Sequence, residues 1–269
     1  MEGSESLSHT WKNKWALITG ATSGIGKALA EDLAGVGARL VLTGRRLDRL
    51  QALAQALNAK HGTEAHVIQA DLSDPNAPNL IWSFTQRQQI EVDVLVNNAG
   101  LLQHGEFVSS ELKVELQMVQ VHCLAVLHLT HLYLPSIVQR KTGHVLIVAS
   151  TTLVPAPYLT TYAATKGFDL LFAEGLREEV AKHGVNVSAL CAGPTESELH
   201  SNASSAPNEP NHMLQPAWQV AHRALAGLAA GKPRIHPSWL ARLVSSLPRF
   251  LPRSTVSGGG ERMYRPGRI

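Results

Sequence analysis

Two side chains in the sequence Tyr162-Ala-Ala-Thr-Lys166 are spaced for acid–base chemistry. Residues four positions apart lie on one face of a helix, so the Tyr162 phenol and the Lys166 ammonium are expected to be neighbours. A free tyrosine titrates near pH ~10, and an adjacent cation favours the phenolate and lowers that pKa. Ser150 follows an apolar segment and offers a hydroxyl to the same substrate oxygen. These residues predict proton exchange with a substrate oxygen.

A glycine-rich segment near the N-terminus has the spacing of a phosphate-binding loop. It follows the apolar run 15–19 and precedes a helical pattern. Glycines allow a sharp turn and a close approach to a pyrophosphate, and the helix adds N–H groups and its positive dipole end. This strand–loop–helix order predicts a dinucleotide site. The residues expected to hold the dinucleotide here are Gly20, Thr22, Ser23, Gly24, Ile25 and Gly26.

The residues after the second apolar run indicate which dinucleotide binds. An NAD site places a carboxylate about twenty residues beyond the glycines, where it binds the ribose 2′-hydroxyl. This sequence has Arg45 and Arg46 there, and its first carboxylate is Asp48. Guanidinium groups suit a phosphate, so the pattern favours NADP(H). We expect Arg45 to bind the 2′-phosphate, with one of the two arginines belonging to the solvated start of the next helix.

Short apolar runs alternate with longer helical patterns along the chain. The expected strands are 15–19, 39–43, 65–69, 93–96, 144–149 and 185–190, and the expected helices are 25–36, 47–60, 77–89, 111–139 and 158–183. Several of the strands are apolar at consecutive positions, as in a sheet that is covered on both faces. This alternation predicts an α/β fold with a doubly wound parallel sheet, in which ligands bind at the carboxyl ends of the strands.

Composition excludes several other classes of protein. The chain has 269 residues, 44% of them apolar and 17% charged, which suits a full hydrophobic core rather than a disordered chain. Two cysteines are too few for a disulfide framework, and the polar N-terminus does not read as a secretory signal. Three histidines interrupt the longest apolar stretch, 121–134, short of the ~18 residues of a membrane span. We expect a soluble, cytoplasmic protein.

The charge is unevenly distributed. The net charge is +3, and from Lys232 onward the chain carries eight Lys and Arg residues but only one carboxylate, Glu261. Such a basic segment suits an anionic partner. The sequence has no basic patch interleaved with aromatic residues, so nucleic acid is not expected as a partner. His122, His128 and His131 lack carboxylates at ligand spacing, so no metal site is expected.

Taken together, the motifs resemble the short-chain dehydrogenase/reductase family in its standard single-domain form, over about residues 14–199. The segment 19–26 matches the family's TGxxxGxG, and Asn97-Asn98-Ala99-Gly100 matches its NNAG. Asp71 and Leu72 match the acidic step that contacts the adenine. The resemblance implies a single-domain Rossmann-type fold of about seven strands, a nicotinamide cofactor, and assembly into a homodimer or homotetramer.

The resemblance also implies a role for each site residue. Ser150 would position the carbonyl and Tyr162 would exchange the proton. Lys166 would hold the nicotinamide ribose and lower the pKa of Tyr162. Asn98, Ala99 and Gly100 would lie beside the cofactor. Gly193 and Pro194 would also border the cofactor. Ser197 is close in sequence to the position where the family has a threonine that contacts the carboxamide of the nicotinamide.

The sequence departs from the family in three places. His122 stands where the family has an asparagine that holds a water in the proton relay, and it is either a relay residue or a packed polar residue. The interval from Ser150 to Tyr162 is one residue short, which makes Thr151 an alternative hydroxyl donor. The usual Pro-Gly after the sixth strand reads Ala192-Gly193-Pro194.

The chain divides into four predicted segments. They are a flexible extension over 1–13, an NADP(H)-binding domain over 14–233 with a substrate loop at 195–215, an amphipathic segment over 234–253 and a flexible basic tail over 254–269. In the amphipathic segment, Trp239, Leu243 and Leu251 share a stripe at helical spacing. That stripe packs on the domain or a partner subunit, or lies on an anionic membrane.

These observations predict an enzyme, an NADP(H)-dependent oxidoreductase that interconverts a carbonyl and a secondary alcohol as its small-molecule substrates. Tyr162 would act as the acid or base, with Ser150 and Lys166. Two alternatives stay open. One is a catalytically weak dinucleotide-binding protein that serves as a sensor or scaffold, and the other is a membrane-surface reductase of lipid-like ketones.

Overall fold

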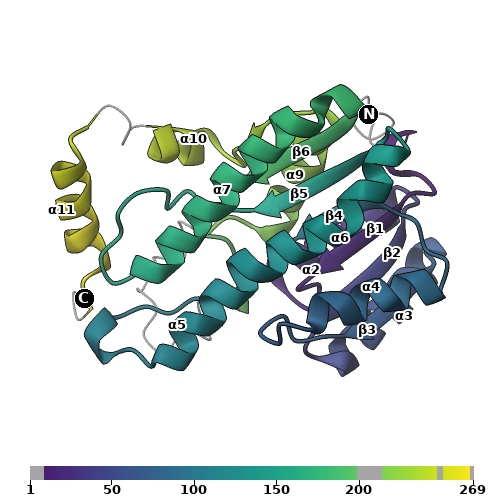
Figure 1. The fold of residues 1–269 in the computed structure, drawn as a ribbon, viewed down its shortest axis with the longest axis horizontal. Coiled ribbons are helices and arrows are strands. Elements are labelled where there is room, and N and C mark those ends of the chain that lie inside the picture. Colours follow the sequence, from purple (N-terminus) through teal and green to yellow (C-terminus); the bar gives the residue numbers. More distant parts are fainter. Residues whose placement is uncertain (1–8, 199–213, 247–250, 267–269) are drawn as a thin grey trace.

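The core of the chain is one parallel sheet, seen here in a computed structural model that describes residues 9–198, 214–246 and 251–266 (Figure 1). The strands are β1 (Trp15–Thr19), β2 (Arg39–Gly44), β3 (Ala65–Gln69), β4 (Val92–Asn97), β5 (Gly143–Val148), β6 (Val185–Leu190) and β7 (Arg234–Ile235). Their order is β3-β2-β1-β4-β5-β6-β7, with parallel pairing throughout. The direction of winding reverses between β1 and β4, where doubly wound sheets bind ligands. The predicted α/β fold with about seven strands is confirmed.

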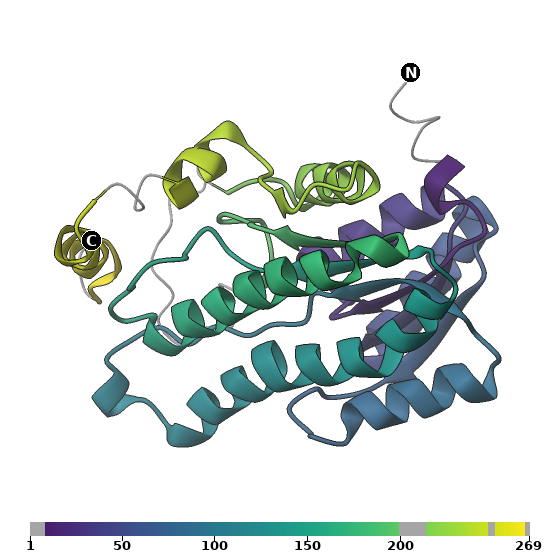
Figure 2. The ribbon, with the colours of Figure 1, turned by 45° about the horizontal axis from the view of Figure 1, so that its top comes forward.

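Helices cover both faces of this sheet (Figure 2). They are α2 (Gly24–Gly35), α3 (Leu47–His61), α4 (Ala77–Arg87), α5 (Leu112–Val119), α6 (Ala125–Gln139), α7 (Thr160–Val180), α9 (Ala217–Ala229), α10 (Trp239–Ser246) and α11 (Arg253–Tyr264). Helices α2, α3 and α9 pack on one face, and α4, α6 and α7 pack on the other. Helix α9 was absent from the helices that the sequence predicted.

The strands are apolar at consecutive positions because each side chain meets a helix on its own face. In β1, Ala16 and Ile18 belong to the same core as Leu29 of α2. Leu17 points to the opposite face and packs in the core that contains Leu129 of α6. All of these side chains are fully buried. The alternation of β-strand side chains thus fills two separate hydrophobic cores, one on each face.

The predicted helix over 111–139 forms α5 and α6, joined by one turn of π-helix at Gln120–Leu124. Its length and hydropathy suffice for a membrane span, but half of its most apolar window is buried inside the protein, as in a core helix. The π-turn places an extra residue between the two helices, and His122 lies within it. Such turns often occur at functional sites.

The N-terminal boundary of the domain differs from the prediction. A flexible extension was expected over 1–13, but Trp11 is fully buried in the core on the α2 face. Its ring packs edge-on against His144 at the start of β5, with ring centroids 4.7 Å apart. The domain therefore begins before Trp11 rather than at residue 14, and 1–8 lie outside the described residues.

The C-terminal boundaries also differ. The expected domain end at 233 is wrong, because Arg234 and Ile235 form β7 and pair with β6. The tail over 254–269 was expected to be flexible, yet most of it forms α11. No residue of α11 is buried, so the helix is held through contacts along one side. Figure 1 shows α11 beyond the N-terminal end of α7.

Candidate active site

The glycine-rich loop joins β1 to α2 at the switch point of the sheet. Gly20 and Gly24 have φ angles of 67° and 53°, a left-handed conformation that other residues rarely adopt. A Cβ atom on Gly20 would lie 2.9 Å from the Cα of Ala99, and one on Gly26 would overlap the carbonyl of Gly20. The N-terminus of α2 has no side-chain cap and no acidic residue in its first turn. This cradle fits the pyrophosphate of a dinucleotide.

The Asn97–Gly100 motif after β4 is tied directly to this loop. The Asn98 side-chain amide donates to the Thr19 carbonyl at 2.8 Å. The Thr19 hydroxyl accepts from the backbone N–H groups of Asn98 and Ala99, at 2.9 and 3.0 Å. These bonds fix the carboxyl ends of β1 and β4 relative to one another, so the two loops that border the switch point form one rigid surface.

The other residues that the sequence assigned to the cofactor lie at the same sheet edge. Asp71 follows β3, is exposed, and accepts from the Ser73 N–H through Oδ1 at 3.0 Å. Leu72 is buried in the core. Gly193 and Pro194 follow β6, and the Pro194 carbonyl accepts from the Gln215 N–H. The residues 199–213 of the predicted substrate loop lie outside the described residues.

The two arginines after β2 point in different directions. Arg46 reaches the glycine loop, where its Nη2 donates to Thr22 Oγ1 at 2.7 Å and to Ser23 Oγ at 3.3 Å. The Arg45 side chain is exposed, and the Arg45 carbonyl accepts from the Gln69 side-chain amide at 2.8 Å. In the structure it is Arg46, rather than the Arg45 that the sequence favoured, whose side chain contacts the glycine loop.

Ser150 lies just past β5 and is nearly buried. Its Oγ accepts a hydrogen bond from the Thr152 N–H at 3.0 Å, which leaves the hydroxyl proton available for a substrate oxygen. Thr151 was the alternative donor, and its side chain instead lies beside Gly193. Ser150 is therefore the better placed hydroxyl to polarise a carbonyl.

Lys166 lies on α7 and is buried with its charge compensated. Its Nζ donates to the Val148 carbonyl at 2.7 Å and to Asp169 Oδ2 at 2.9 Å. Burial acts to lower the pKa of Lys166, but the Asp169 carboxylate and Tyr162 together raise that pKa above its ordinary value. Lys166 is thus held as a cation, which is the form that favours the Tyr162 phenolate.

Tyr162 is half-buried on the same helix, and its ring packs edge-on against His122, with centroids 5.8 Å apart. His122 is fully buried and uses both ring nitrogens. Nε2 accepts from the Leu101 N–H at 3.0 Å, so the ring proton must sit on Nδ1, which donates to Thr165 Oγ1 at 2.8 Å. His122 therefore ties the segment after Gly100 to α7.

This geometry bears on the two roles that the sequence left open for His122. Burial, and secondarily the nearby Lys166 cation, hold the pKa of His122 well below its ordinary value. A neutral imidazole whose two nitrogens are already engaged has no site left for a relayed proton. The arrangement favours the packed polar role, in which His122 positions Tyr162 and its neighbours.

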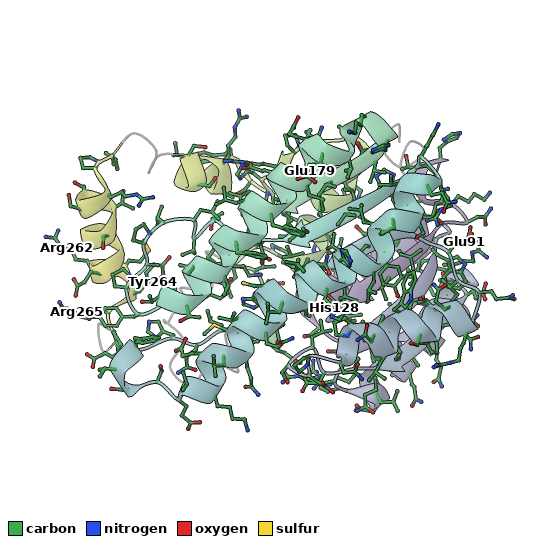
Figure 3. The ribbon with its side chains drawn as sticks, in the orientation of Figure 1. Glu91, His128, Glu179, Arg262, Tyr264 and Arg265 are labelled. Carbon is green, nitrogen blue, oxygen red and sulfur yellow. The ribbon has the colours of Figure 1, made fainter. Side chains whose placement is uncertain are left out.

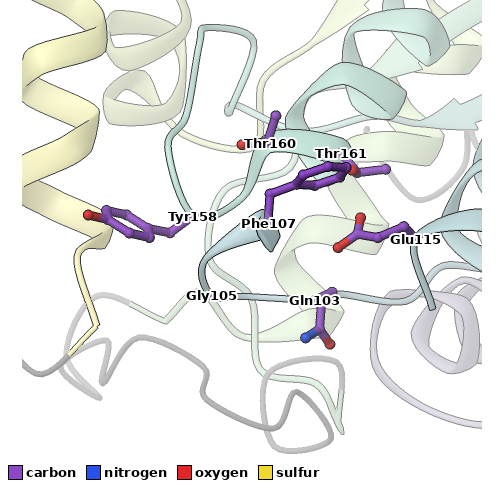
Figure 4. Close-up of a pocket in the computed structure, with 7 residues that line it drawn as sticks. All are labelled: Gln103, Gly105, Phe107, Glu115, Tyr158, Thr160 and Thr161. Atoms are coloured by element: carbon purple, nitrogen blue, oxygen red, sulfur yellow. The ribbon is translucent and has the colours of Figure 1, made fainter. Parts of the chain in front are cut away.

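A small pocket lies between the 103–107 segment, α5 and the start of α7 (Figure 4). It is lined by Gln103, Phe107, Glu115 and Thr161, and Tyr158 points from its rim toward α11. Tyr158 has a φ angle of 66°, which is strained for a bulky residue and is typical of functional loops. The pocket therefore lies beside the first residues of α7, the helix that carries Tyr162.

Helix α11 borders this region. Tyr264 packs in a small cluster with Tyr162, Leu102, Leu159 and Ala163, and its carbonyl contacts His104 Nε2 at 2.7 Å. Figure 3 labels Tyr264 between α11 and α7, with Arg262 and Arg265 farther out. A segment predicted to be a mobile tail thus contributes to the wall beside the catalytic tyrosine.

Three residues of the site were missed from the sequence. Asp169 was detectable, because it lies three positions beyond Lys166 on one helix and such spacing brings charged side chains together. Glu198 and Tyr264 carried no local signal, because each reaches the site from a distant part of the chain. Within the described residues, no cluster of His, Cys, Asp and Glu could hold a metal ion.

A glycine loop at the switch point of a parallel sheet, with serine, tyrosine and lysine at the same edge, is the arrangement typical of dinucleotide-dependent oxidoreductases. The family model for short chain dehydrogenases matches residues 14–208. The chain belongs to this family, as its motifs indicated.

Curated relatives and solved structures agree with this assignment. The chain is 34% identical over 201 residues to "Dehydrogenase/reductase SDR family member 7B" of Bos taurus, a match that covers 72% of this chain and 62% of the relative. It is 36% identical over 182 residues to "Very-long-chain 3-oxoacyl-CoA reductase-B" of Danio rerio, covering 66% and 58%. The chain spans about three fifths of the length of the curated relatives it matches.

Among solved structures, the fold is similar to that of a short-chain dehydrogenase from Sphingobium yanoikuyae in complex with NADPH. The TM-score is 0.80 at 27% identity, covering 95% of this chain and 98% of the other. A 7beta-hydroxysteroid dehydrogenase gives a TM-score of 0.83 at 25% identity, covering 94% and 98%. Neighbours are described with NADPH or with NAD, which supports a nicotinamide cofactor for this family of folds.

Proposed function

We propose that the protein is an NADP(H)-dependent oxidoreductase that interconverts a carbonyl and a secondary alcohol. The observation that carries the proposal is the convergence of Ser150, Tyr162 and Lys166 at the sheet edge that also holds the glycine loop. Helix α7 presents the tyrosine and the lysine, and the end of β5 presents the serine. When bound, the nicotinamide supplies or accepts a hydride at the substrate carbon.

The chain's own residues handle the oxygen and its proton. The free hydroxyl proton of Ser150 points to a role in polarising the carbonyl oxygen. Tyr162 donates the proton in reduction and accepts it in oxidation. The Lys166 cation favours the phenolate that forms when Tyr162 gives up its proton, which lets the tyrosine work nearer neutral pH.

Preference for NADP(H) rests on the surroundings of Arg46. Its guanidinium lies on the glycine loop beside Thr22 and Ser23, and no carboxylate follows β2 directly. These groups would hold a 2′-phosphate through charge and hydroxyl donors. The ribose carboxylate typical of an NAD site is absent at this position in the sequence.

The test is turnover with a panel of ketones, aldehydes and 3-oxoacyl thioesters, followed by the absorbance of the reduced cofactor. Tyr162→Phe is expected to lower kcat by at least about 100-fold, because it removes the proton donor. Its Kd for NADPH should stay within about twofold, since the ring is kept. Hydride transfer at the wild-type rate in Tyr162→Phe would refute the mechanism.

For the substrate, we propose a lipid-like ketone. Several curated relatives are named as very-long-chain 3-oxoacyl-CoA reductases, and one structural neighbour is a hydroxysteroid dehydrogenase. The surface beside Tyr162 includes the apolar cluster of Leu102, Leu159 and Tyr264. A series of 3-oxoacyl thioesters of increasing chain length should give a kcat/KM that rises with length.

A second candidate function is a dinucleotide-binding protein with little catalysis. It is favoured by His122, which replaces the family's relay asparagine and has both nitrogens engaged. His122→Asn separates the two functions. A large gain in turnover would show that the native site has lost catalytic power, whereas unchanged or reduced turnover supports the enzyme.

We also propose that a second copy of the chain packs against α5, α6 and α7. These helices, with the π-turn between α5 and α6, expose Leu116, Leu124, Leu127 and Leu171, with 58%, 51%, 45% and 69% of each residue accessible. Exposed leucines on adjoining helices form the kind of apolar surface that interfaces bury. This is the homo-oligomer that the family resemblance implies.

A further inference from the structure

Glu198 forms ion pairs with Arg46, which is expected to meet the cofactor, and with Arg49. Its Oε2 accepts from Arg46 Nη1 and its Oε1 accepts from Arg49 Nη1, each at 2.5 Å. The two guanidinium groups hold the pKa of the Glu198 carboxyl below its usual range, so it is an anion near neutral pH. The same Arg46 side chain donates to Thr22 and Ser23 of the glycine loop.

The segment that carries Glu198 lies against the glycine loop. Ser197 approaches Gly24 so closely that a Cβ on Gly24 would lie 2.7 Å from the Ser197 Cβ. The segment is anchored where Thr195 pairs with Gln215, through hydrogen bonds of 3.0 and 2.9 Å between the flanking backbones. Glu198 therefore lies three residues beyond a point where the backbone is fixed by hydrogen bonds, and this short segment places its carboxylate beside Arg46.

A carboxylate and a phosphate present similar oxygen pairs to a guanidinium fork. Within the part of the chain that the structure describes, Glu198 is the one carboxylate that pairs with Arg46 and Arg49, and its oxygens take the Nη1 donors of both. We propose that Glu198 is a specificity-determining residue that occupies the place of the 2′-phosphate and must leave when NADP(H) binds. This inference rests on the proposed function, and it adds Arg49 as a second phosphate ligand.

The consequence is that Glu198 weakens the binding of NADP(H) but not that of NAD(H). NADP(H) must displace Glu198, whereas NAD(H) has no 2′-phosphate and leaves both ion pairs in place. Glu198 thus lowers the preference for NADP(H) that the arginines would otherwise set. It also links the cofactor to the segment that starts the predicted substrate loop, because displacement frees Glu198 from Arg46 and Arg49.

The test is the variant Glu198→Gln, with Kd values for NADPH and NADH measured by calorimetry. An exposed ion pair contributes up to about a fivefold change in an equilibrium constant, and Glu198 makes two. We expect the Kd for NADPH to fall by about five- to twentyfold and that for NADH to change by less than about twofold. Glu196→Gln is the matched control, since Glu196 is exposed on the same segment, and both Kd values should stay unchanged.

Adenosine 2′,5′-bisphosphate is a second probe, because it carries the 2′-phosphate without the nicotinamide. In Glu198→Gln, the Kd for this bisphosphate should fall, as the Kd for NADPH does. Adding Arg49→Gln to the Glu198→Gln variant should raise the Kd for the bisphosphate several-fold. An unchanged NADPH-to-NADH ratio would overturn the inference. So would weaker NADH binding, which would make Glu198 an acceptor for the ribose 2′-hydroxyl.

The outcome is separable from that of the proposed function. If Glu198→Gln shifts the ratio but no carbonyl compound is turned over, the proposed reaction fails and the role of Glu198 stands. If turnover is found and the ratio does not shift, only the role of Glu198 fails. If neither dinucleotide binds to the wild-type chain, both fail.

Discussion

Two buried histidines should make the protein sensitive to acid. Burial, followed by the Lys166 cation, lowers the pKa of His122 well below its ordinary value. Burial, followed by Lys14, lowers the pKa of His144 to about 4, although Asp93 acts to raise it. Both side chains are therefore neutral in the folded protein across the range where a free histidine becomes protonated.

The sign and size of the effect follow from linkage. In the unfolded chain each histidine titrates near pH ~6.5, so below that pH the unfolded state binds more protons than the folded state. The stability that neutral burial permits is present above pH ~6.5 and is lost as the pH falls toward the folded pKa. Between about pH 7 and about pH 5, His144 removes about 2 kcal/mol from the free energy of unfolding, and His122 acts in the same direction. This is a large part of a typical total stability of ~5–15 kcal/mol.

The assay is urea unfolding of wild type, His122→Asn and His144→Asn at about pH 7 and about pH 5. Each variant is compared with itself at the two pH values, so the cost of the substitution cancels. The loss on acidification should shrink in both variants, by about 2 kcal/mol in His144→Asn. His131→Asn is the control, because His131 is exposed on α6 and its replacement should leave the loss unchanged. A loss in His122→Asn equal to that of wild type would refute the neutral, buried state of His122.

Two further predictions concern the newly defined N-terminal boundary and the proposed interface. Trp11→Ala should lower the free energy of unfolding by about 3–5 kcal/mol, because the ring is fully buried. Trp218→Ala removes a ring that is 62% exposed and should cost less than about 0.5 kcal/mol in the same urea experiment. Leu171→Glu should convert the proposed dimer into a monomer in light scattering, whereas Leu80→Glu, at an exposed position on α4, should not. A dimer that survives Leu171→Glu would exclude this face.

The fold was predictable because its signals are local. The glycine loop between β1 and α2, the apolar strands and the helix that holds Tyr162 and Lys166 each depend on spacing within about ten residues. Trp11 was missed because one aromatic residue before the first strand has no periodicity to mark it. Helix α11 was missed because Gly258, Gly259 and Gly260 oppose helix formation and the segment has little to bury. Its helix depends on contacts with the 155–158 loop and the Tyr162 cluster, which only the tertiary structure brings together.

The choice between Arg45 and Arg46 shows where sequence reasoning ends. Both follow β2, and successive side chains at the end of a strand point to opposite sides. The sequence therefore predicts that both arginines lie near the end of β2, but it does not predict which side chain faces the glycine loop. In the structure it is Arg46, the residue just before α3, that faces the loop. Glu198, from beyond β6, then meets it across 152 residues of sequence, a separation that no local pattern can report.

Asp169 explains how a buried Lys166 can act on Tyr162. An ammonium has three protons to donate, and the Val148 carbonyl and Asp169 accept two of them. One donor is therefore left for the phenol or for a ribose hydroxyl. Without Asp169, burial alone would lower the pKa of Lys166 and favour the neutral amine, which cannot stabilise a phenolate. The carboxylate weakens the field of the cation at Tyr162, but it preserves the cation itself. The proton chemistry at Tyr162 thus depends on a residue that does not touch the substrate.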